Sequence, residues 1–60
     1  MLLDKINYTV ERLDGDYAYL KNDDDETAEL KCVARALLPA EIVEGSGLVY
    51  EMMEYSVKNP

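Results

Sequence analysis

The chain is expected to fold as an all-β domain: a small antiparallel barrel of four or five strands, SH3-like or OB-like in kind, with one short helical turn near residues 34–38. Three observations predict this fold. Apolar and polar residues alternate in several short runs, which is the period of a strand. Turn-forming residues separate these runs, and no run is long enough to form an extended helix. A chain of 60 residues can hold only one domain, spanning residues 1–60.

The clearest element is a first strand followed by a hairpin. Ile6, Tyr8 and Val10 alternate with polar residues, so one face of this strand is apolar. Asp14-Gly15 supplies a tight reversal, because glycine readily adopts the positive φ that such turns require. The chain then returns through a second strand over residues 17–20.

The length of the hairpin loop decides which side chains of the returning strand face the core. A two-residue turn would set Val10 opposite Tyr19, whereas a three-residue turn at residues 13–15 would set Val10 opposite Ala18. We favour the second register, because it buries aliphatic side chains together and leaves Tyr17 and Tyr19 on the outer face. It also pairs Tyr8 with Leu20 and Arg12 with Asp16.

A solvated loop and a third strand are expected next. The acidic segment Asp23-Asp24-Asp25-Glu26 is expected to be the loop, because its like charges repel and resist burial. A third strand is predicted over residues 27–33, where Ala28, Leu30 and Cys32 alternate with polar residues and so face the core. On this pattern Cys32 is a core side chain.

A single helical turn is predicted at residues 34–38. It ends at or before Pro39, because proline disfavours the helical conformation of the residue before it. Leu38 is expected to plug the barrel as its central core residue.

Two further strands are predicted towards the carboxyl end. The flexible segment Gly45-Ser46-Gly47 begins a fourth strand at Leu48, and residues 54–58 form a fifth. The apolar phase changes near Met52-Met53, which predicts a bend or a bulge there.

Two segments carry a resemblance to a known family: Leu13-Asp14-Gly15-Asp16-Tyr17-Ala18, and Val33-Ala34-Arg35-Ala36-Leu37-Leu38-Pro39 followed by Glu44-Gly45. In these segments the chain resembles a family of very short, acidic bacterial proteins that is catalogued only as a domain of unknown function. The resemblance implies a small β fold in a bacterial, cytoplasmic protein, and it supplies no activity and no site residues. Gly45-Ser46 departs from the Gly-Asp expected in that family, and Ala34 stands where proline is more usual.

The charge of the chain restricts its partners. Thirteen acidic and six basic side chains give a formal charge of −7. Such a charge repels phosphate backbones and anionic membrane surfaces at long range, so nucleic acid is disfavoured as a partner. No segment is apolar over the length that a signal peptide or a membrane span requires. We therefore expect a cytoplasmic protein that does not bind membranes.

The residue inventory argues against catalysis, cofactors and metals. With no histidine and a single cysteine, Cys32, the chain offers neither a base beside a thiol nor a zinc ligand set nor a disulfide. A calcium loop starting at Asp23 would put Ala28 where glycine is required and Ala34 where a bidentate glutamate is required. Weak attraction of cations by the acidic loop stays open. We expect no enzyme activity, no cofactor and no metal site.

Tyrosines are the residues that remain for recognition, since the chain has five of them and neither phenylalanine nor tryptophan. Tyr8, Tyr50 and Tyr55 are expected in the core or at its rim. Tyr17 and Tyr19 form the candidate interaction surface, because a tyrosine ring buries area while its hydroxyl stays hydrated. Selection for β-propensity alone is the competing explanation.

The function that these features predict is a non-enzymatic protein- or peptide-interaction module, with self-association as one form of it. The alternative is a small barrel that binds single-stranded nucleic acid by stacking bases on its tyrosines. The acidic charge argues against this alternative, and the basic residues are spread along the chain rather than gathered in a stripe.

Overall fold

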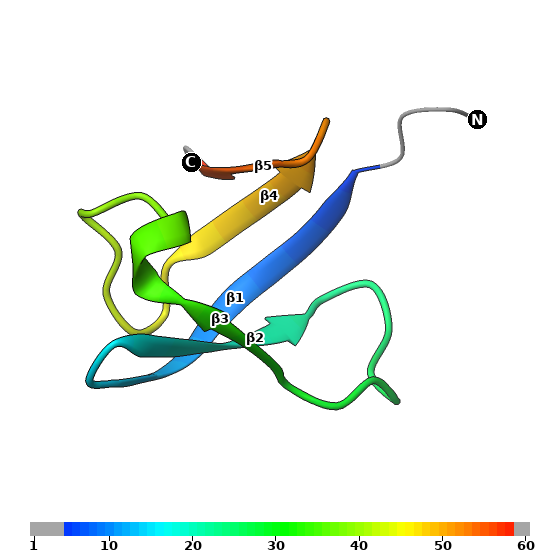
Figure 1. The fold of residues 1–60 in the computed structure, drawn as a ribbon. Helices are drawn as coiled ribbons and strands as arrows, with labels where there is room; N and C mark the ends of the chain where they lie inside the picture. The colour runs from blue at the N-terminus through cyan, green and yellow to red at the C-terminus, as the bar shows by residue number, and fades with distance from the viewer. Residues whose placement is uncertain (1–4, 59–60) are drawn as a thin grey trace.

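The protein forms a single five-stranded antiparallel sheet that curls into a half-barrel (Figure 1). The computed structural model describes residues 5–58. The strands are β1 (Ile6–Asp14), β2 (Tyr17–Asn22), β3 (Lys31–Ala34), β4 (Gly47–Glu51) and β5 (Glu54–Val57). One 3₁₀ turn, η1 (Arg35–Leu37), follows β3, and residues 5–58 contain no α-helix. The predicted all-β fold with one helical turn near residues 34–38 is confirmed. The amino-terminal residues 1–4, which entered the expectation of a missing signal peptide, lie outside the described residues.

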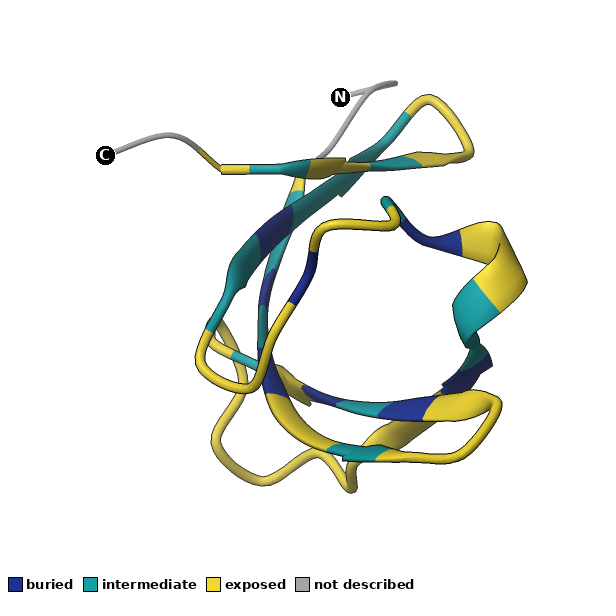
Figure 2. Cartoon of the chain, turned by 90° about the vertical axis from the view of Figure 1, so that its left-hand side faces the viewer, coloured by how far each residue is buried: buried dark blue, intermediate teal, exposed yellow. Residues whose placement is uncertain are grey.

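The order of the strands in space is β3-β2-β1-β4-β5, so β1 is central and β3 and β5 are the two edges. β1 pairs with β2 on one side and, over Ile6–Thr9, with β4 on the other. Figure 2 shows the resulting curl, in which the two ends of the sheet approach each other without joining. The half-barrel therefore has an open side between its two edge strands.

The hairpin between β1 and β2 follows neither of the registers that the sequence left open. Its turn is Gly15-Asp16, and Gly15 has a φ of 58°. The observed pairs, counted from the turn, are Asp14–Tyr17, Leu13–Ala18, Arg12–Tyr19, Val10–Leu20, Thr9–Lys21 and Tyr8–Asn22. The favoured pairs Val10–Ala18, Tyr8–Leu20 and Arg12–Asp16 are therefore wrong.

Two features account for the difference. The turn lies at Gly15-Asp16 rather than at residues 13–15, and a β-bulge at Glu11 then shifts the register once more. The register shifts directly after Val10, so that Val10 and Leu13 both face the concave side although they are an odd number of positions, three, apart. The side chains of β2 that face the core are nevertheless those predicted, because Ala18 and Leu20 are fully buried. The bulge thus lets β1 contribute one more apolar residue to the core than strict alternation allows.

β3 is shorter than the predicted strand over residues 27–33, and its phase is the opposite one. Val33 is its buried residue, because it pairs with Ala18 on the concave side. Cys32 pairs with Tyr19 and lies on the convex side. Three residues that were expected in the core are exposed: Ala28, Leu30 and Cys32.

The core lies on the concave side of the sheet. Leu38 belongs to it, as predicted, but the residues with no exposed surface are Ala18, Leu20 and Leu48, so the centre is formed by strands. Leu38 and Ile42 come from the segment between η1 and β4, which crosses the concave side (Figure 2). The buried apolar residues are Tyr8, Val10, Ala18, Leu20, Val33, Leu38, Ile42 and Leu48.

The predicted change of phase at Met52-Met53 is a two-residue hairpin turn between β4 and β5. Glu51 and Glu54 pair on either side of it. Both methionines have positive φ, 54° and 63°, which is the requirement of a type I′ turn. Both side chains are exposed. A hairpin tip of two exposed methionines is unusual, because asparagine and glycine adopt these angles more easily.

Candidate functional site

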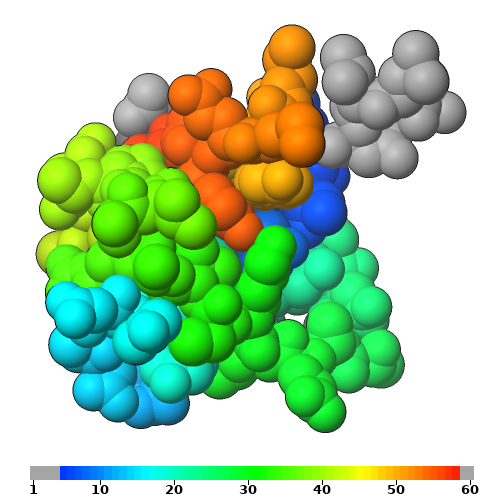
Figure 3. Space-filling view, in the orientation of Figure 1, coloured from blue at the N-terminus to red at the C-terminus, as the bar shows by residue number. Residues whose placement is uncertain are grey.

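A groove of about 470 Å³ separates the two edges of the half-barrel. In Figure 3 the green surface of β3 and η1 meets the orange surface of the β4–β5 hairpin at this place. One wall consists of Lys31, Cys32, Val33, Ala34 and Leu37. The other consists of Tyr50, Met53, Glu54 and Tyr55. The groove is therefore lined mainly by apolar and aromatic side chains.

The β3 wall also presents backbone groups that the sheet does not use. The Arg35 N–H donates to the Asp16 carbonyl oxygen at 2.8 Å, which continues the β2–β3 ladder by one pair. Hydrogen-bonded and non-hydrogen-bonded pairs alternate along an antiparallel ladder. The backbone N–H and C=O groups of Cys32 and Ala34 therefore face away from β2, towards the free edge.

The β5 wall follows the same alternation. The Lys58 N–H donates to the Gly47 carbonyl oxygen at 2.9 Å, one pair beyond the end of the β4–β5 ladder. The backbone groups of Tyr55 and Val57 consequently face away from β4. Each wall of the groove is thus an edge strand with free donors and acceptors.

Lys31 spans the groove from β3 to the aromatic wall. Its side chain lies on the concave side, because Lys31 pairs with the buried Leu20. Its ammonium lies 5.2 Å from the ring centroid of Tyr50 and 5.6 Å from those of Tyr8 and Tyr55. Contact with the Tyr55 hydroxyl raises the pKa of Lys31 above its usual value, although partial burial opposes this effect. Lys31 is therefore a cation held against three aromatic rings.

The three tyrosines of this cluster occupy the positions that the sequence predicts, in the core or at its rim. Tyr8 is buried, and Tyr50 and Tyr55 are half-buried against the core. The Tyr50 and Tyr55 rings lie 4.6 Å apart and are tilted by 46°, and the Tyr8 and Tyr55 rings lie 6.2 Å apart. Such tilted pairs are favourable contacts between aromatic rings.

Tyr17 and Tyr19, the predicted interaction surface, lie on the convex face of β2. Tyr17 is 52% exposed, whereas Tyr19 is half-buried, with the Arg12 guanidinium 4.2 Å above its ring. Their partners across the ladder are Ala34 and Cys32, which line the groove. The two tyrosines therefore flank the β3 wall on its outer side.

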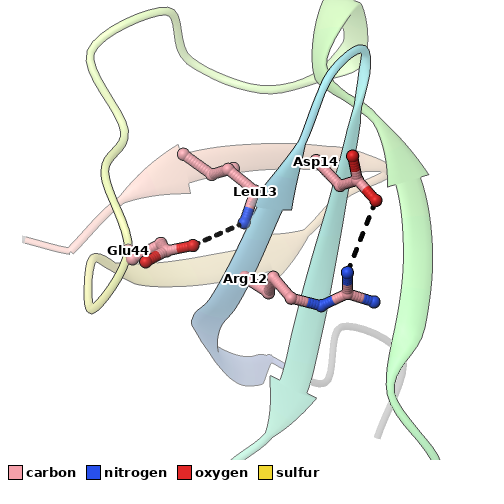
Figure 4. A network of polar contacts seen from close by, with 4 residues as sticks. All are labelled: Arg12, Leu13, Asp14 and Glu44. Atoms are coloured by element: carbon pink, nitrogen blue, oxygen red, sulfur yellow. Dashed lines mark hydrogen bonds and ion pairs between the residues drawn. The ribbon is translucent and has the colours of Figure 1, made fainter.

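The end of the β1–β2 hairpin is fastened by polar contacts (Figure 4). The Leu13 N–H donates to Glu44 Oε2 at 3.0 Å, beyond the point where β4 stops pairing with β1. Arg12 forms an ion pair with Asp14 at 3.4 Å. Glu44 thus satisfies a backbone donor that the sheet leaves without a strand partner.

The acidic loop is held to β1 by hydrogen bonds that its carboxylates accept. Asp24 Oδ2 accepts from the backbone N–H of Asn7 at 3.1 Å and from its side-chain amide at 3.2 Å. Asp23 accepts from the Thr9 hydroxyl at 2.9 Å. Within residues 5–58, no three acidic or cysteine side chains gather in a group that could hold a metal ion.

Asp25 forms a local turn with Thr27. Its Oδ1 accepts from the Thr27 hydroxyl at 2.7 Å and from the Thr27 N–H at 3.0 Å. These two bonds, the hydroxyl first, lower the pKa of Asp25 below its usual value of 3.8. The carboxylate therefore supports the loop by remaining ionised.

Sequence reasoning missed the groove and two of its apolar residues, Leu37 and Met53. The sequence contained a signal for these two residues, because each adjoins another large apolar residue: Leu37 adjoins Leu38, and Met53 adjoins Met52. Where side chains alternate between two faces, two adjacent apolar residues cannot both be buried on the same face. One residue of each such pair is then free to line a surface.

Comparison with protein-family models, with curated proteins and with solved structures found no match. The resemblance to the family of acidic bacterial proteins therefore stays a prediction. In the described part of the chain, no helix has the length and apolarity needed to cross a membrane.

Proposed function

We propose that this protein is a non-enzymatic interaction module that binds an extended segment of another protein in the groove between β3 and β5. The observation that carries the proposal is the coincidence of an apolar groove with two free strand edges. A strand added to a sheet edge gains affinity from backbone hydrogen bonds and specificity from pockets for alternate side chains. This groove offers both in one place.

The geometry favours pairing with β3. An added strand would lie about 4.8 Å from β3, where it meets the free backbone groups of Cys32 and Ala34. Alternate side chains of the segment would then point inward, against Val33 and Tyr55. The others would point outward, on the face that carries Tyr17. In this proposal the predicted interaction surface of Tyr17 and Tyr19 borders the groove on its outer side.

Exposed apolar side chains at the rim support the same proposal. Leu37 and Met53 are 70% and 89% exposed and line opposite walls. Methionine and leucine at an open groove supply apolar contact area, and methionine adapts to different partners. The groove thus combines free edges with a rim suited to contact.

The test is a titration of the isotopically labelled protein followed by NMR. The probe is a capped peptide of about eight residues that alternates valine and threonine, a length and pattern typical of a strand. We expect the amide signals of β3 and β5 to shift. Shifts confined to the convex face around Tyr17, or no shift at all, would overturn the proposal.

Two pairs of variants separate the groove from the rest of the surface. Cys32→Pro removes a free edge N–H without removing a β2–β3 hydrogen bond, so it should abolish binding, whereas Cys32→Ser should not. Leu37→Glu with Met53→Glu should weaken binding if the proline variant does not fold. Val43→Glu changes a residue that is 62% exposed and outside the groove, so it should leave binding unchanged.

A further inference from the structure

We infer that the segment bound by the groove is basic, with a lysine or arginine side chain beside the β4–β5 hairpin. This inference rests on the proposed function and names the chemistry of the partner. It is carried by the placement of Glu51 and Glu54 at one wall of the groove.

Glu51 and Glu54 are paired directly across the ladder that closes the Met52-Met53 turn. Like charges in directly opposed positions destabilise a strand pair. Among residues 5–58 the one ion pair is that of Arg12 with Asp14, so neither glutamate has a basic partner. The hairpin therefore carries a repulsion that a cation would relieve.

The position of this pair connects it with the groove. Glu54 lines the groove, whereas Glu51 is half-buried beside it. Tyr50 and Tyr55 occupy the neighbouring pair and are packed against the core, so the alternation of β5 turns Glu54 to the outer face. An outward side chain of a bound segment would lie on the same face as Glu54.

The charge of the whole chain points in the same direction. A formal charge of −7 attracts basic segments at long range and repels a second copy of this chain. The cation of the groove, Lys31, is held against three tyrosine rings rather than beside the two glutamates. A basic segment is thus favoured over self-association and over an acidic partner.

The test compares three capped peptides of equal length in which valine alternates with lysine, with threonine or with glutamate. We expect the lysine peptide to bind about tenfold more tightly than the threonine peptide at low salt, and the preference to shrink as salt rises. The glutamate peptide should bind most weakly. Dissociation constants from the NMR titration measure the three affinities.

The double variant Glu51→Gln/Glu54→Gln assigns the preference to the pair. It should bring the lysine peptide to within about threefold of the threonine peptide without changing the affinity of the latter. The control Glu11→Gln/Glu41→Gln changes the net charge equally, but neither residue lines the groove, so it should keep the preference. Equal loss in both variants would overturn the assignment to Glu51 and Glu54.

The two proposals fail in different ways. Equal binding of all three peptides at the groove would overturn the inference of a basic partner and leave the proposed function standing. Binding of none of them would overturn the proposed function itself.

Discussion

The ammonium of Lys31, in the edge strand β3, lies 5.2 Å from the ring centroid of Tyr50 on the opposite wall of the groove. β3 and the β4–β5 hairpin occupy opposite ends of the sheet and share no backbone pairing. A side-chain contact between them therefore acts across the open side of the half-barrel. Its contribution to stability can be measured separately from that of the sheet.

Lys31→Met should lower the free energy of unfolding by about 0.5–1 kcal/mol, which is the usual size of an exposed cation–π contact. Methionine keeps most of the aliphatic stem and removes the charge. Urea denaturation measures the change, with Lys21→Met, an exposed lysine of β2, as the control. Equal effects of the two substitutions would show that the ring contact contributes nothing.

The contribution of Lys31 should depend on pH only in the alkaline range. Its pKa is raised in the folded state, so the stabilisation is complete below the unfolded value of 10.5 and is lost as the pH rises through the folded pKa. We therefore expect the stability difference between wild type and Lys31→Met to be constant from neutral pH up to pH 10.5 and to shrink at higher pH. A difference that already shrinks near neutral pH would contradict this origin.

Asp25 should titrate below 3.8, because the Thr27 hydroxyl and N–H donate to its carboxylate. Its stabilisation is present above pH 3.8 and is lost as the pH falls through the lower folded pKa. Thr27→Val removes the hydroxyl and should move the pKa of Asp25 upwards, whereas Thr27→Ser should not. NMR titration of the side-chain carboxyl measures both, and an unchanged pKa in Thr27→Val would refute the assignment.

The adjacent leucines of the turn after β3 should differ sharply in their effect on stability. Leu38→Ala should cost about 2–5 kcal/mol because Leu38 is buried, whereas Leu37→Ala should change stability by less than about 0.5 kcal/mol. Leu38→Val, a smaller truncation, serves if the alanine variant does not fold. A loss below about 1 kcal/mol for Leu38→Ala would mean that the segment after η1 is not part of the core.

The hairpin tip should show a trade-off between stability and binding. Met52→Asn/Met53→Gly places residues that adopt positive φ readily at both turn positions, so it should raise the free energy of unfolding by about 1 kcal/mol. The same variant removes the Met53 side chain from the groove and should weaken binding of the valine–lysine peptide. Met52→Asn alone is the control, because Met52 does not line the groove. Gain of stability without loss of binding would exclude Met53 from the site.

The all-β fold, the first strand, the helical turn and the burial of Leu38 could be predicted from the sequence, because alternation and turn chemistry are local properties. The bulge at Glu11 could not be placed, although the three-residue spacing of Val10 and Leu13 is visible in the sequence. The sequence of the hairpin alone gives no reason for the ladder to be interrupted. The bulge is explained by the core, because it allows Val10 and Leu13 both to pack there.

The phase of β3 depended on its partner. Cys32 and Val33 are both apolar, so alternation alone fits either phase of this short strand. Pairing with β2 decides between them, because Val33 lies opposite buried Ala18 and Cys32 lies opposite Tyr19 on the convex face. A short apolar run therefore identified a strand without identifying its buried face.

The sequence by itself determined the class of this fold, its acidic charge and the tyrosines available for contacts, since each depends only on composition and local pattern. Tertiary structure alone decided where the groove lies. The groove arises because β3 and β5, distant along the chain, end on opposite edges of one curled sheet and remain unpaired. Whether a strand has a free edge depends on how the strands associate, and the sequence of a single strand does not show on which side it will be unpaired.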